Sequence, residues 1–263
     1  MAGKVKDAAV DPVAWDEPRL ASPHDQADKA QRVRRMFDAI AGTYQLVNSL
    51  ASLGLDAYWR REMVRLAAVR PDDVLLDVAC GTGEVARAFA SAPVRPGRII
   101  AVDFSRPMLA RAAARPIIWG SFWQADALHL PVADASVSIV TCAFGIRNFQ
   151  VLGEGLSEMY RVLRVGGRAV VLEFALPRRP LLRRLYLLYF TRIMPMAATL
   201  VSRDRTGAYR YLPRSVVSFP DSEGVVSTFQ SAGFGRVAVH RRSGGIVTLY
   251  VASKTGGDAT VRR

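Results

Sequence analysis

The stretch Asp77-Val-Ala-Cys-Gly-Thr-Gly83 overlaps the end of a short apolar run, residues 74–78, and precedes a helical pattern over residues 85–90. A buried apolar run, a glycine-containing loop and a helix, in this order, are typical of the strand–loop–helix unit of α/β proteins. Gly81 and Gly83 allow positive φ and a close approach of the backbone to a ligand. The stretch therefore predicts a buried strand with a binding loop at its carboxyl end.

The alternation of strand and helix continues along the chain. Further strands are expected at residues 98–103, 122–124, 137–142 and 168–174, and helices at residues 105–114, 153–163 and 222–232. This order predicts parallel strands with right-handed crossovers, which is an α/β, Rossmann-like, doubly wound sheet. Two last strands, residues 236–241 and 246–253, flank a short Ser-Gly-Gly turn and should pair antiparallel at the sheet edge.

Helical and irregular segments surround this predicted sheet. Residues 28–71 have apolar residues at helical spacing and are expected to form a helical lid. Residues 178–212, rich in arginine and aromatic residues, are expected to form a helical cap inserted after the fifth strand. Residues 1–27 contain three prolines and no apolar period, so a flexible arm is expected there, with a flexible tail over residues 255–263. The predicted organisation is one domain over residues 28–254.

The composition limits the function classes. The chain has 263 residues, 50% of them hydrophobic and 22% charged, which suffices for a large core without disulfides. Its 36 Lys and Arg against 23 Asp and Glu give a net charge of +13, which favours nucleic acid, acidic lipid or a charged ligand as partner. Two cysteines are too few for a disulfide framework or a zinc cluster. With no apolar run of about 18 residues and no signal peptide, a cytoplasmic protein without a metal is expected.

Acidic residues follow three successive predicted strands. Asp77 ends the first strand and Asp103 ends the second, 20 residues after Gly83. At about this offset an acidic residue binds the ribose hydroxyls in dinucleotide-binding folds. Asp126 follows the third strand and can accept a hydrogen bond from an amino group such as the adenine N6. We therefore expect these carboxylates at one ligand site, where the carboxyl ends of the strands meet.

The loop sequence favours a nucleoside without phosphates. It lacks the third glycine of the dinucleotide fingerprint and the Lys-Ser/Thr of a P-loop. Three carboxylates would also repel phosphate groups. A cationic nucleoside fits, and S-adenosylmethionine is one. Each feature alone has a purely structural interpretation, as a turn glycine or a strand-end cap, whereas the three acids together favour a methyl-donor site.

Several blocks resemble known methyltransferases. Asp77–Gly83 resembles the first motif of class I S-adenosylmethionine-dependent methyltransferases. Longer similarity is to the ubiquinone/menaquinone biosynthesis C-methyltransferase family and covers roughly residues 30–253. It is carried by residues 37–44, 52–60, 143–148, 158–167, 172–174, 209–213, 218–220 and 232–234. The blocks Phe-Gly-Ile-Arg-Asn, ending at Asn148, and Tyr-Arg-Tyr-Leu-Pro, ending at Pro213, are the most specific to this family.

The resemblance implies methyl transfer from S-adenosylmethionine to a ring carbon of a polyprenylated quinol. Both demethylmenaquinol and the benzoquinol of the ubiquinone pathway remain open as substrates. With the loop residues included, the donor-binding candidates are Asp77, Gly81, Thr82, Gly83, Asp103, Asp126, Ala127 and Ala143. The family commonly has Ser where Ala143 stands, so only a backbone contact is expected at that position.

Arg147 and Tyr44 are the catalytic candidates under this resemblance. Arg147 stays protonated and cannot act as a base, but it can hold the oxyanion that forms as the quinol ring becomes nucleophilic. Its structural alternative is a hydrogen bond to a loop carbonyl or an ion pair with a carboxylate such as Glu173. Tyr44 can hydrogen-bond the ring hydroxyl, or it only packs the N-terminal helix as a lid.

Three further residues have reactive side chains. His129 follows the third-strand acid and is a candidate general base, with an exposed turn residue before Pro131 as the alternative. Cys80 and Cys142 end strands near the expected donor, and both are expected to be small buried apolar residues without a catalytic role.

Two other functions remain open at this stage. One is a methyltransferase of the same fold that acts on a soluble aromatic metabolite. The other is a basic nucleic-acid-binding protein, which the charge and the aromatic residues Trp119, Phe122 and Trp123 would suit. The cations are scattered and no recognition-helix, RNP or zinc motif occurs, so we expect no nucleic-acid partner.

The segment from Arg178 to Arg205 resembles a basic amphipathic helix. Its predicted apolar face carries Leu181, Leu182, Leu185, Leu188 and Tyr189, with Arg183 and Arg184 beside it. Helices of this kind lie in membrane interfaces. We expect peripheral docking on the anionic inner face of the cytoplasmic membrane, with a cap on the core or a homodimer contact as the alternatives.

Overall fold

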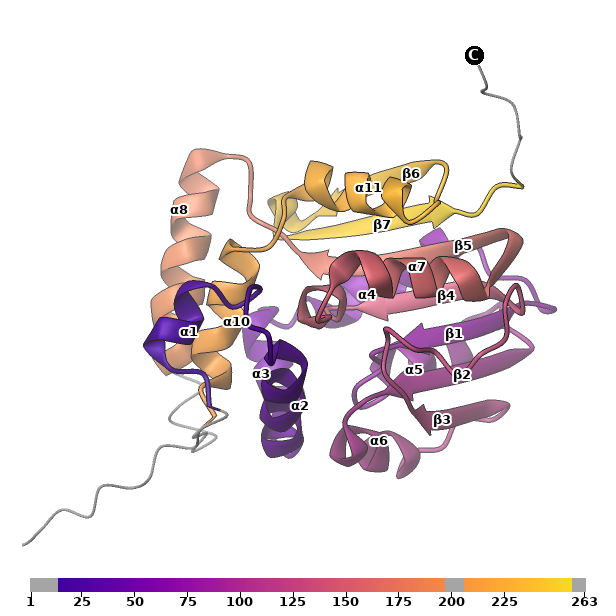
Figure 1. The fold of residues 1–263 in the computed structure, drawn as a ribbon, viewed down its shortest axis with the longest axis horizontal. Helices are drawn as coiled ribbons and strands as arrows, with labels where there is room; N and C mark the ends of the chain where they lie inside the picture. Colours follow the sequence, from indigo (N-terminus) through magenta and orange to yellow (C-terminus); the bar gives the residue numbers. More distant parts are fainter. Residues whose placement is uncertain (1–13, 197–205, 257–263) are drawn as a thin grey trace, which may run out of the picture.

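A seven-stranded sheet forms the centre of the computed structural model, which describes residues 14–196 and 206–256 (Figure 1). The strand order is β3-β2-β1-β4-β5-β7-β6. The strands are β1 Val74–Val78, β2 Arg98–Asp103, β3 Gly120–Gln124, β4 Val137–Ala143, β5 Leu163–Phe174, β6 Val237–Arg242 and β7 Val247–Ser253. Strands β1 to β5 pair in parallel, and β7 runs antiparallel to both β5 and β6. The predicted doubly wound sheet is confirmed, with its antiparallel strand one position in from the edge.

Helices cover both faces of the sheet. They are α4 Asp56–Ala67, α5 Glu84–Ala90, α6 Arg106–Ala113, α7 Leu152–Val162 and α11 Ser222–Ser231. Side chains alternate across β1, so Leu75 belongs to one core cluster and Leu76 and Val78 to the other. Because the strand order reverses between β1 and β4, the carboxyl ends of these two strands frame the crevice where doubly wound sheets bind ligands.

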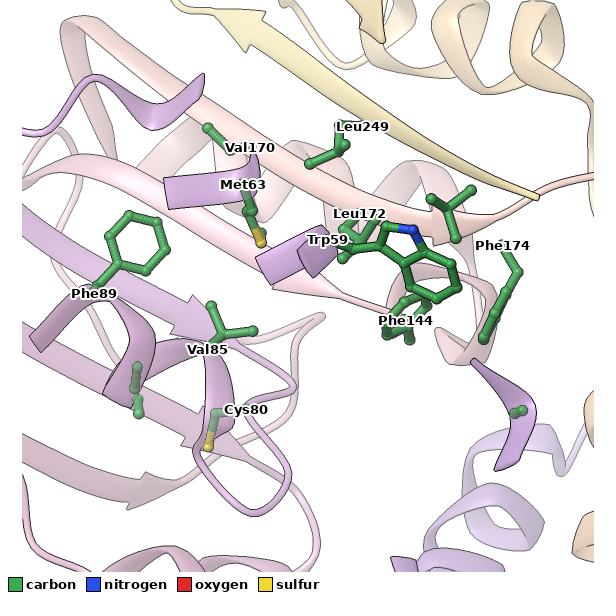
Figure 2. Close-up of a cluster of buried hydrophobic side chains, with 14 of the residues drawn as sticks. Trp59, Met63, Cys80, Val85, Phe89, Phe144, Val170, Leu172, Phe174 and Leu249 are labelled. Carbon is green, nitrogen blue, oxygen red and sulfur yellow. The ribbon is translucent and has the colours of Figure 1, made fainter. Parts of the chain in front are cut away.

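Helix α4 is part of the core. Figure 2 shows Trp59 and Met63 of this helix beside Leu172 and Leu249 of the sheet, and neither α4 side chain has exposed surface. The Trp59 ring lies 6.0 Å from the Phe144 ring and 6.1 Å from the Phe174 ring, measured between centroids. The lid expected over residues 28–71 is therefore shorter than predicted, since its last helix packs on the sheet.

Two short helices stand at the carboxyl edge of the sheet. These are α2 Lys29–Ile40 and α3 Tyr44–Ala51, which lie beside α10 Ala208–Val217 (Figure 1). Val33, Met36 and Ile40 of α2 form a third core cluster with Tyr211 of α10. This position over the strand ends is the one expected for a lid.

The flexible arm predicted for residues 1–27 is wrong for residues 14–27. They contain the helix α1 Glu17–Ala21, and Asp16 caps this helix by accepting the Arg19 amide N–H. Trp15 is 1% exposed, and its ring centroid lies 4.4 Å from that of Tyr211. Leu20 is also 1% exposed and belongs to the same core cluster as Trp15. Two anchors five residues apart leave no helical period in the sequence. Residues 1–13 and 257–263 lie outside the described structure.

The predicted cap after β5 is helical where it is described. It consists of α8 Pro180–Leu188, the π-helical turn η2 Tyr189–Ile193 and α10. Arg203 and Arg205 lie outside the described residues. Within residues 14–196 and 206–256, no helix has both the length and the apolar character needed to cross a bilayer.

Replacing Trp15 with Ala tests the packing of the N-terminal segment. The variant removes a buried aromatic side chain and should lower the free energy of unfolding by about 3–5 kcal/mol. Urea denaturation followed by circular dichroism measures this change. Trp119→Ala is the matched control, because Trp119 is 72% exposed and its loss should matter by about 0.5 kcal/mol or less. Equal stability of Trp15→Ala and wild type would contradict the packing described here.

Candidate active site

A cavity of about 710 Å³ lies at the carboxyl ends of β1, β2 and β4. Most of the predicted site residues meet there. The lining includes Tyr44, Gly81, Asp103, Asp126, Ala127 and Ala143. Asp77, Thr82 and Gly83 are not part of the lining, and the first two are buried behind it in β1 and its loop. We call this space the strand-end cavity.

Asp103 fastens the glycine loop to the end of β2. Its Oδ2 accepts the Gly81 amide N–H at 2.8 Å, and its Oδ1 accepts the Ser105 amide N–H at 2.8 Å. Burial raises the pKa of Asp103 to about 6. A carboxylate has about four acceptor positions, so two remain for hydroxyl groups of a ligand.

Asp77 is a buried acid in which only one of the two carboxylate oxygens accepts a hydrogen bond from the described residues. The Thr141 hydroxyl of β4 donates to Asp77 Oδ1 at 2.8 Å, whereas Oδ2 has no partner in normal hydrogen-bond geometry among the described groups. Burial raises the pKa of Asp77 to about 7, although the Thr141 hydroxyl favours the charged form. The Thr82 hydroxyl is likewise buried without a partner. Unsatisfied buried polar groups are uncommon, and here they adjoin the loop of the strand-end cavity.

A second, smaller cavity of about 430 Å³ adjoins the first. Phe37 and Tyr44 line both cavities, whereas Arg147 lines only the smaller one. We call it the Arg147 cavity; its other lining residues are Met36, Ile40, Asn48, Ala208, Tyr211 and Leu212. Removal from water raises the pKa of Tyr44 to about 12, so its hydroxyl stays protonated at neutral pH. The two predicted catalytic residues are therefore brought to one place, with Tyr44 at the boundary of the cavities.

Arg147 is held by Glu173, and its Nε is still able to donate. Its Nη1 donates to Glu173 Oε1 at 2.5 Å and to the Phe144 carbonyl oxygen at 2.8 Å. The ion pair is buried, since the two side chains are 6% and 1% exposed. Arg147 Nε is buried without a partner among the described groups. The structural alternative from the sequence is therefore correct for one edge of the guanidinium group, while Nε remains able to donate.

A hydrogen bond joins the two most specific sequence blocks. The Tyr211 hydroxyl donates to Asn148 Oδ1 at 3.0 Å, and Asn148 Nδ2 donates to the Phe144 carbonyl oxygen at 3.2 Å. Both residues are buried. This link holds α10 over the loop that carries Arg147, which explains why residues distant in the sequence serve one site.

Sequence reasoning missed two contributors to the site. Thr141 supports Asp77, and its signal is a hydroxyl in a strand where Ser138 is the only other hydroxyl-bearing residue. Lys29 donates to the Phe149 carbonyl oxygen at 2.5 Å, and burial lowers its pKa to about 8. It is one of only four lysines in the chain, and its position at the start of a helical pattern could have marked it.

Other candidates do not join the site. His129 is exposed and lies outside the lining of both cavities, which favours its interpretation as a turn residue. Cys80 and Cys142 are buried, and burial raises the pKa of both thiols well above the usual value. Over the described part of the chain, no group of three or more His, Cys, Asp or Glu residues is arranged to hold a metal ion.

Comparison with known proteins gives one consistent result. The model of the ubiE/COQ5 methyltransferase family matches residues 25–254. A protein of Ectopseudomonas mendocina named ubiquinone/menaquinone biosynthesis C-methyltransferase UbiE is 39% identical over 230 residues, which are 86% of this chain and 90% of that protein. A demethylmenaquinone methyltransferase of Chlorobaculum parvum is 38% identical over 234 residues, 87% of this chain and 95% of that one.

Solved structures agree at the level of the fold. A crystal structure described as an S-adenosylmethionine-dependent methyltransferase of Thermotoga maritima, with histamine N-methylation as its suggested activity, has a TM-score of 0.59. The alignment covers 85% of this chain and the whole of that chain at 16% identity. At this identity the likeness supports the Rossmann-like fold alone.

Asp77 should make the stability of the ligand-free protein depend on pH. In the folded state the pKa of the Asp77 carboxyl is about 7, whereas its usual value is 3.8. The folded state therefore binds more protons between about pH 4 and 7, and the free energy of unfolding falls as pH rises through that window. Asp77→Asn cannot ionise, so its stability relative to wild type should increase from pH 4 to pH 7.

Urea denaturation at several pH values measures this difference. Asp134→Asn is the control for the same change of side chain at an exposed position, since the Asp134 side chain is 77% exposed. A profile for Asp77→Asn that runs parallel to that of wild type would show that Asp77 ionises normally.

Proposed function

The chain belongs to the ubiE/COQ5 methyltransferase family, and on that premise we propose that it methylates a ring carbon of a polyprenylated quinol with S-adenosylmethionine as donor. The names of the relatives suggest demethylmenaquinol or the corresponding benzoquinol of ubiquinone synthesis as substrate. The observation that carries the proposal is the pair of cavities that meet at Tyr44, one bordered by acids and the other by Arg147.

The strand-end cavity suits the donor. The unpaired Asp77 Oδ2 can accept a hydrogen bond from the α-ammonium group, and the unpaired Thr82 hydroxyl can bind the α-carboxylate. Asp103 has acceptor positions left for the ribose hydroxyls, and Asp126 can accept the adenine amino group. When bound, S-adenosylmethionine would supply an electrophilic methyl group: the S–CH3 bond breaks as the bond to the ring carbon forms, S-adenosylhomocysteine is left, and the hydrogen of that carbon leaves as a proton to solvent. Binding of the donor would give partners to buried groups that otherwise lack them.

The Arg147 cavity suits the aromatic ring of the acceptor. Met36, Ile40 and Leu212 provide apolar walls that exclude water. A quinol ring becomes nucleophilic at carbon as one hydroxyl loses its proton, and negative charge then grows on that oxygen. Arg147 Nε can donate to this oxygen, because Glu173 already holds the opposite edge of the guanidinium group in place.

Tyr44 orients the acceptor between the two cavities. Because its pKa is about 12, its hydroxyl acts as a hydrogen-bond donor to the ring oxygen rather than as a base. The edge-on Phe37 ring, 5.9 Å from Tyr44 between centroids, restricts where that hydroxyl can lie. A fixed donor of this kind lowers the entropy cost of aligning the ring carbon with the methyl group.

Asp103→Ala should weaken donor binding without unfolding the protein. Charge-assisted hydrogen bonds to ribose hydroxyls are worth about 1.5–3 kcal/mol each, so the dissociation constant should rise at least about tenfold. Isothermal titration calorimetry with S-adenosylmethionine measures it. Asp134→Ala, which removes an exposed carboxylate of equal charge, should bind like wild type. Unchanged affinity in a folded Asp103→Ala would remove Asp103 from the donor site.

Arg147→Lys should reduce turnover more than donor binding. Lysine keeps the positive charge but loses the planar group that can hold Glu173 and an oxyanion at the same time. Loss of one oxyanion donor costs about a hundredfold or more in kcat. The assay is turnover at saturating demethylmenaquinol, with donor affinity as evidence of folding. Wild-type kcat would leave Arg147 with a structural role only.

A further inference from the structure

Five exposed apolar side chains form a stripe along α8 and the helical turns after it. Such large apolar residues usually have a partner when they are contiguous on a surface. The fractions of exposed surface are 72% for Leu181, 57% for Leu185, 50% for Leu188, 53% for Ile193 and 70% for Met196. We call this set the α8 stripe.

The π-helical turn keeps the α8 stripe on one face. Leu181, Leu185 and Leu188 follow the four- and three-residue spacing of an α-helix face. Ile193 comes five residues after Leu188, which in a regular α-helix would move it to another face. In a π-helix the hydrogen bond runs from residue i to residue i+5, and the Met194 amide donates to the Tyr189 carbonyl oxygen in this way. The turn thus brings Ile193, and Met196 three residues later, back into line.

The opposite face of the same segment is fixed to the core. Tyr186, Phe190 and Met194 are at most 4% exposed and recur every four residues. The Phe190 ring lies 5.7 Å from the Phe174 ring at the end of β5, measured between centroids. The α8 stripe therefore faces outward. The apolar face predicted from the sequence is corrected here, because Leu182 and Tyr189 are half-buried.

Positive charge lies beside the α8 stripe. Arg184 stands three residues after Leu181 and four before Leu188, and Arg192 stands four residues before Met196, so both adjoin the stripe on the helix surface. Both arginines are exposed, and the sequence has no Asp or Glu between residues 175 and 203.

Arg183 does not lie beside the α8 stripe, although the sequence predicted it next to the apolar face of the helix. It lines a groove together with Arg178, Asp221 and Glu223, and Glu223 is paired with Arg178. The two acidic groups therefore offset part of the positive charge of that groove, which Arg241 also lines. Arg184 and Arg192, which are exposed, supply the positive charge that adjoins the α8 stripe itself.

We propose that the α8 stripe docks the protein on an anionic lipid bilayer. Leu181, Leu185 and Leu188 enter the interface with Ile193 and Met196, while Arg184 and Arg192 bind the headgroup phosphates. A second copy fits less well, because a two-fold contact along the stripe sets the arginines of one copy against those of the other. The sign of the charge thus selects an anionic surface.

Docking on this face brings the Arg147 cavity close to the membrane. Helix α8 stands beside α10 at the carboxyl edge of the sheet (Figure 1), and Ala208, Tyr211 and Leu212 of α10 line that cavity. A substrate dissolved in the bilayer would therefore have a short path to it. The docking proposal goes beyond the proposed methyl transfer and is tested without it, since vesicle binding needs neither donor nor quinol.

Flotation with vesicles of phosphatidylglycerol and phosphatidylcholine tests the apolar part. The double variant Leu185→Gln/Leu188→Gln should lose at least about tenfold in apparent affinity, since each change removes buried apolar surface at the membrane. Ile118→Gln/Val165→Gln is the matched control, because these residues are 76% and 62% exposed away from α8. Equal binding by wild type and the α8 variant would overturn the proposal.

The charged part is tested with two double variants of equal net charge. Arg184→Glu/Arg192→Glu should reduce binding to phosphatidylglycerol vesicles at least about tenfold. Arg95→Glu/Arg98→Glu, at the exposed amino-terminal side of β2, should stay within about twofold of wild type. Equal losses of affinity in both variants would contradict the role of Arg184 and Arg192, because vesicle binding would then depend only on the net charge of the protein.

Light scattering decides whether a second copy covers the stripe. A monomeric wild type, or a dimer that persists in Leu185→Gln/Leu188→Gln, is the result the docking proposal expects. A wild-type dimer that becomes monomeric in this variant would overturn it, because the stripe would then be the interface between copies of the chain.

Discussion

The buried ion pair between Arg147 and Glu173 is the interaction on which the site depends. Glu173 lies near the end of β5, and its Oε1 accepts from Arg147 Nη1 at 2.5 Å while its Oε2 accepts the Arg147 amide at 3.3 Å. These contacts fix the loop after β4 to the neighbouring strand, and they leave Nε without an acceptor among the residues that the structure describes. If this ion pair broke, a buried charge would be left without a partner, at a high cost in free energy. The arginine is therefore held in one orientation. The Tyr211–Asn148 hydrogen bond then fastens α10 over the same loop.

At the strand-end cavity, the burial of two acidic side chains lowers the stability of the ligand-free protein. Asp77 and Asp103 are both buried, and burial raises both pKa values. Without a ligand, ionising these acids near neutral pH opposes folding. A bound ammonium group and ribose hydroxyls would remove that penalty, which links donor affinity to the stability of the strand-end cavity. We expect the same acids to repel phosphate-bearing nucleotides, so that one arrangement would give both affinity and selectivity.

The sheet and the positions of the acidic residues at its strand ends could be predicted because each rests on a local pattern. Buried strands alternate with helices, and the acids stand at strand ends, where topology brings them together. What the sequence could not reveal depends on single contacts across the fold. Trp15 anchors an otherwise patternless segment on Tyr211, and Thr141 supports Asp77 from the next strand. The π-helical turn was also hidden, because the five-residue spacing from Leu188 to Ile193 breaks the period by which a helix face is recognised.

The central claim is that the chain joins a methyl group to a ring carbon of a quinol at the boundary of the two cavities. Incubation of the purified protein with demethylmenaquinol and donor carrying an isotope-labelled methyl group tests it directly, when the product is examined by mass spectrometry and nuclear magnetic resonance. The account predicts one labelled methyl group per product molecule, bonded to a ring carbon. A label on a ring oxygen, or transfer only to soluble aromatic compounds, would contradict it.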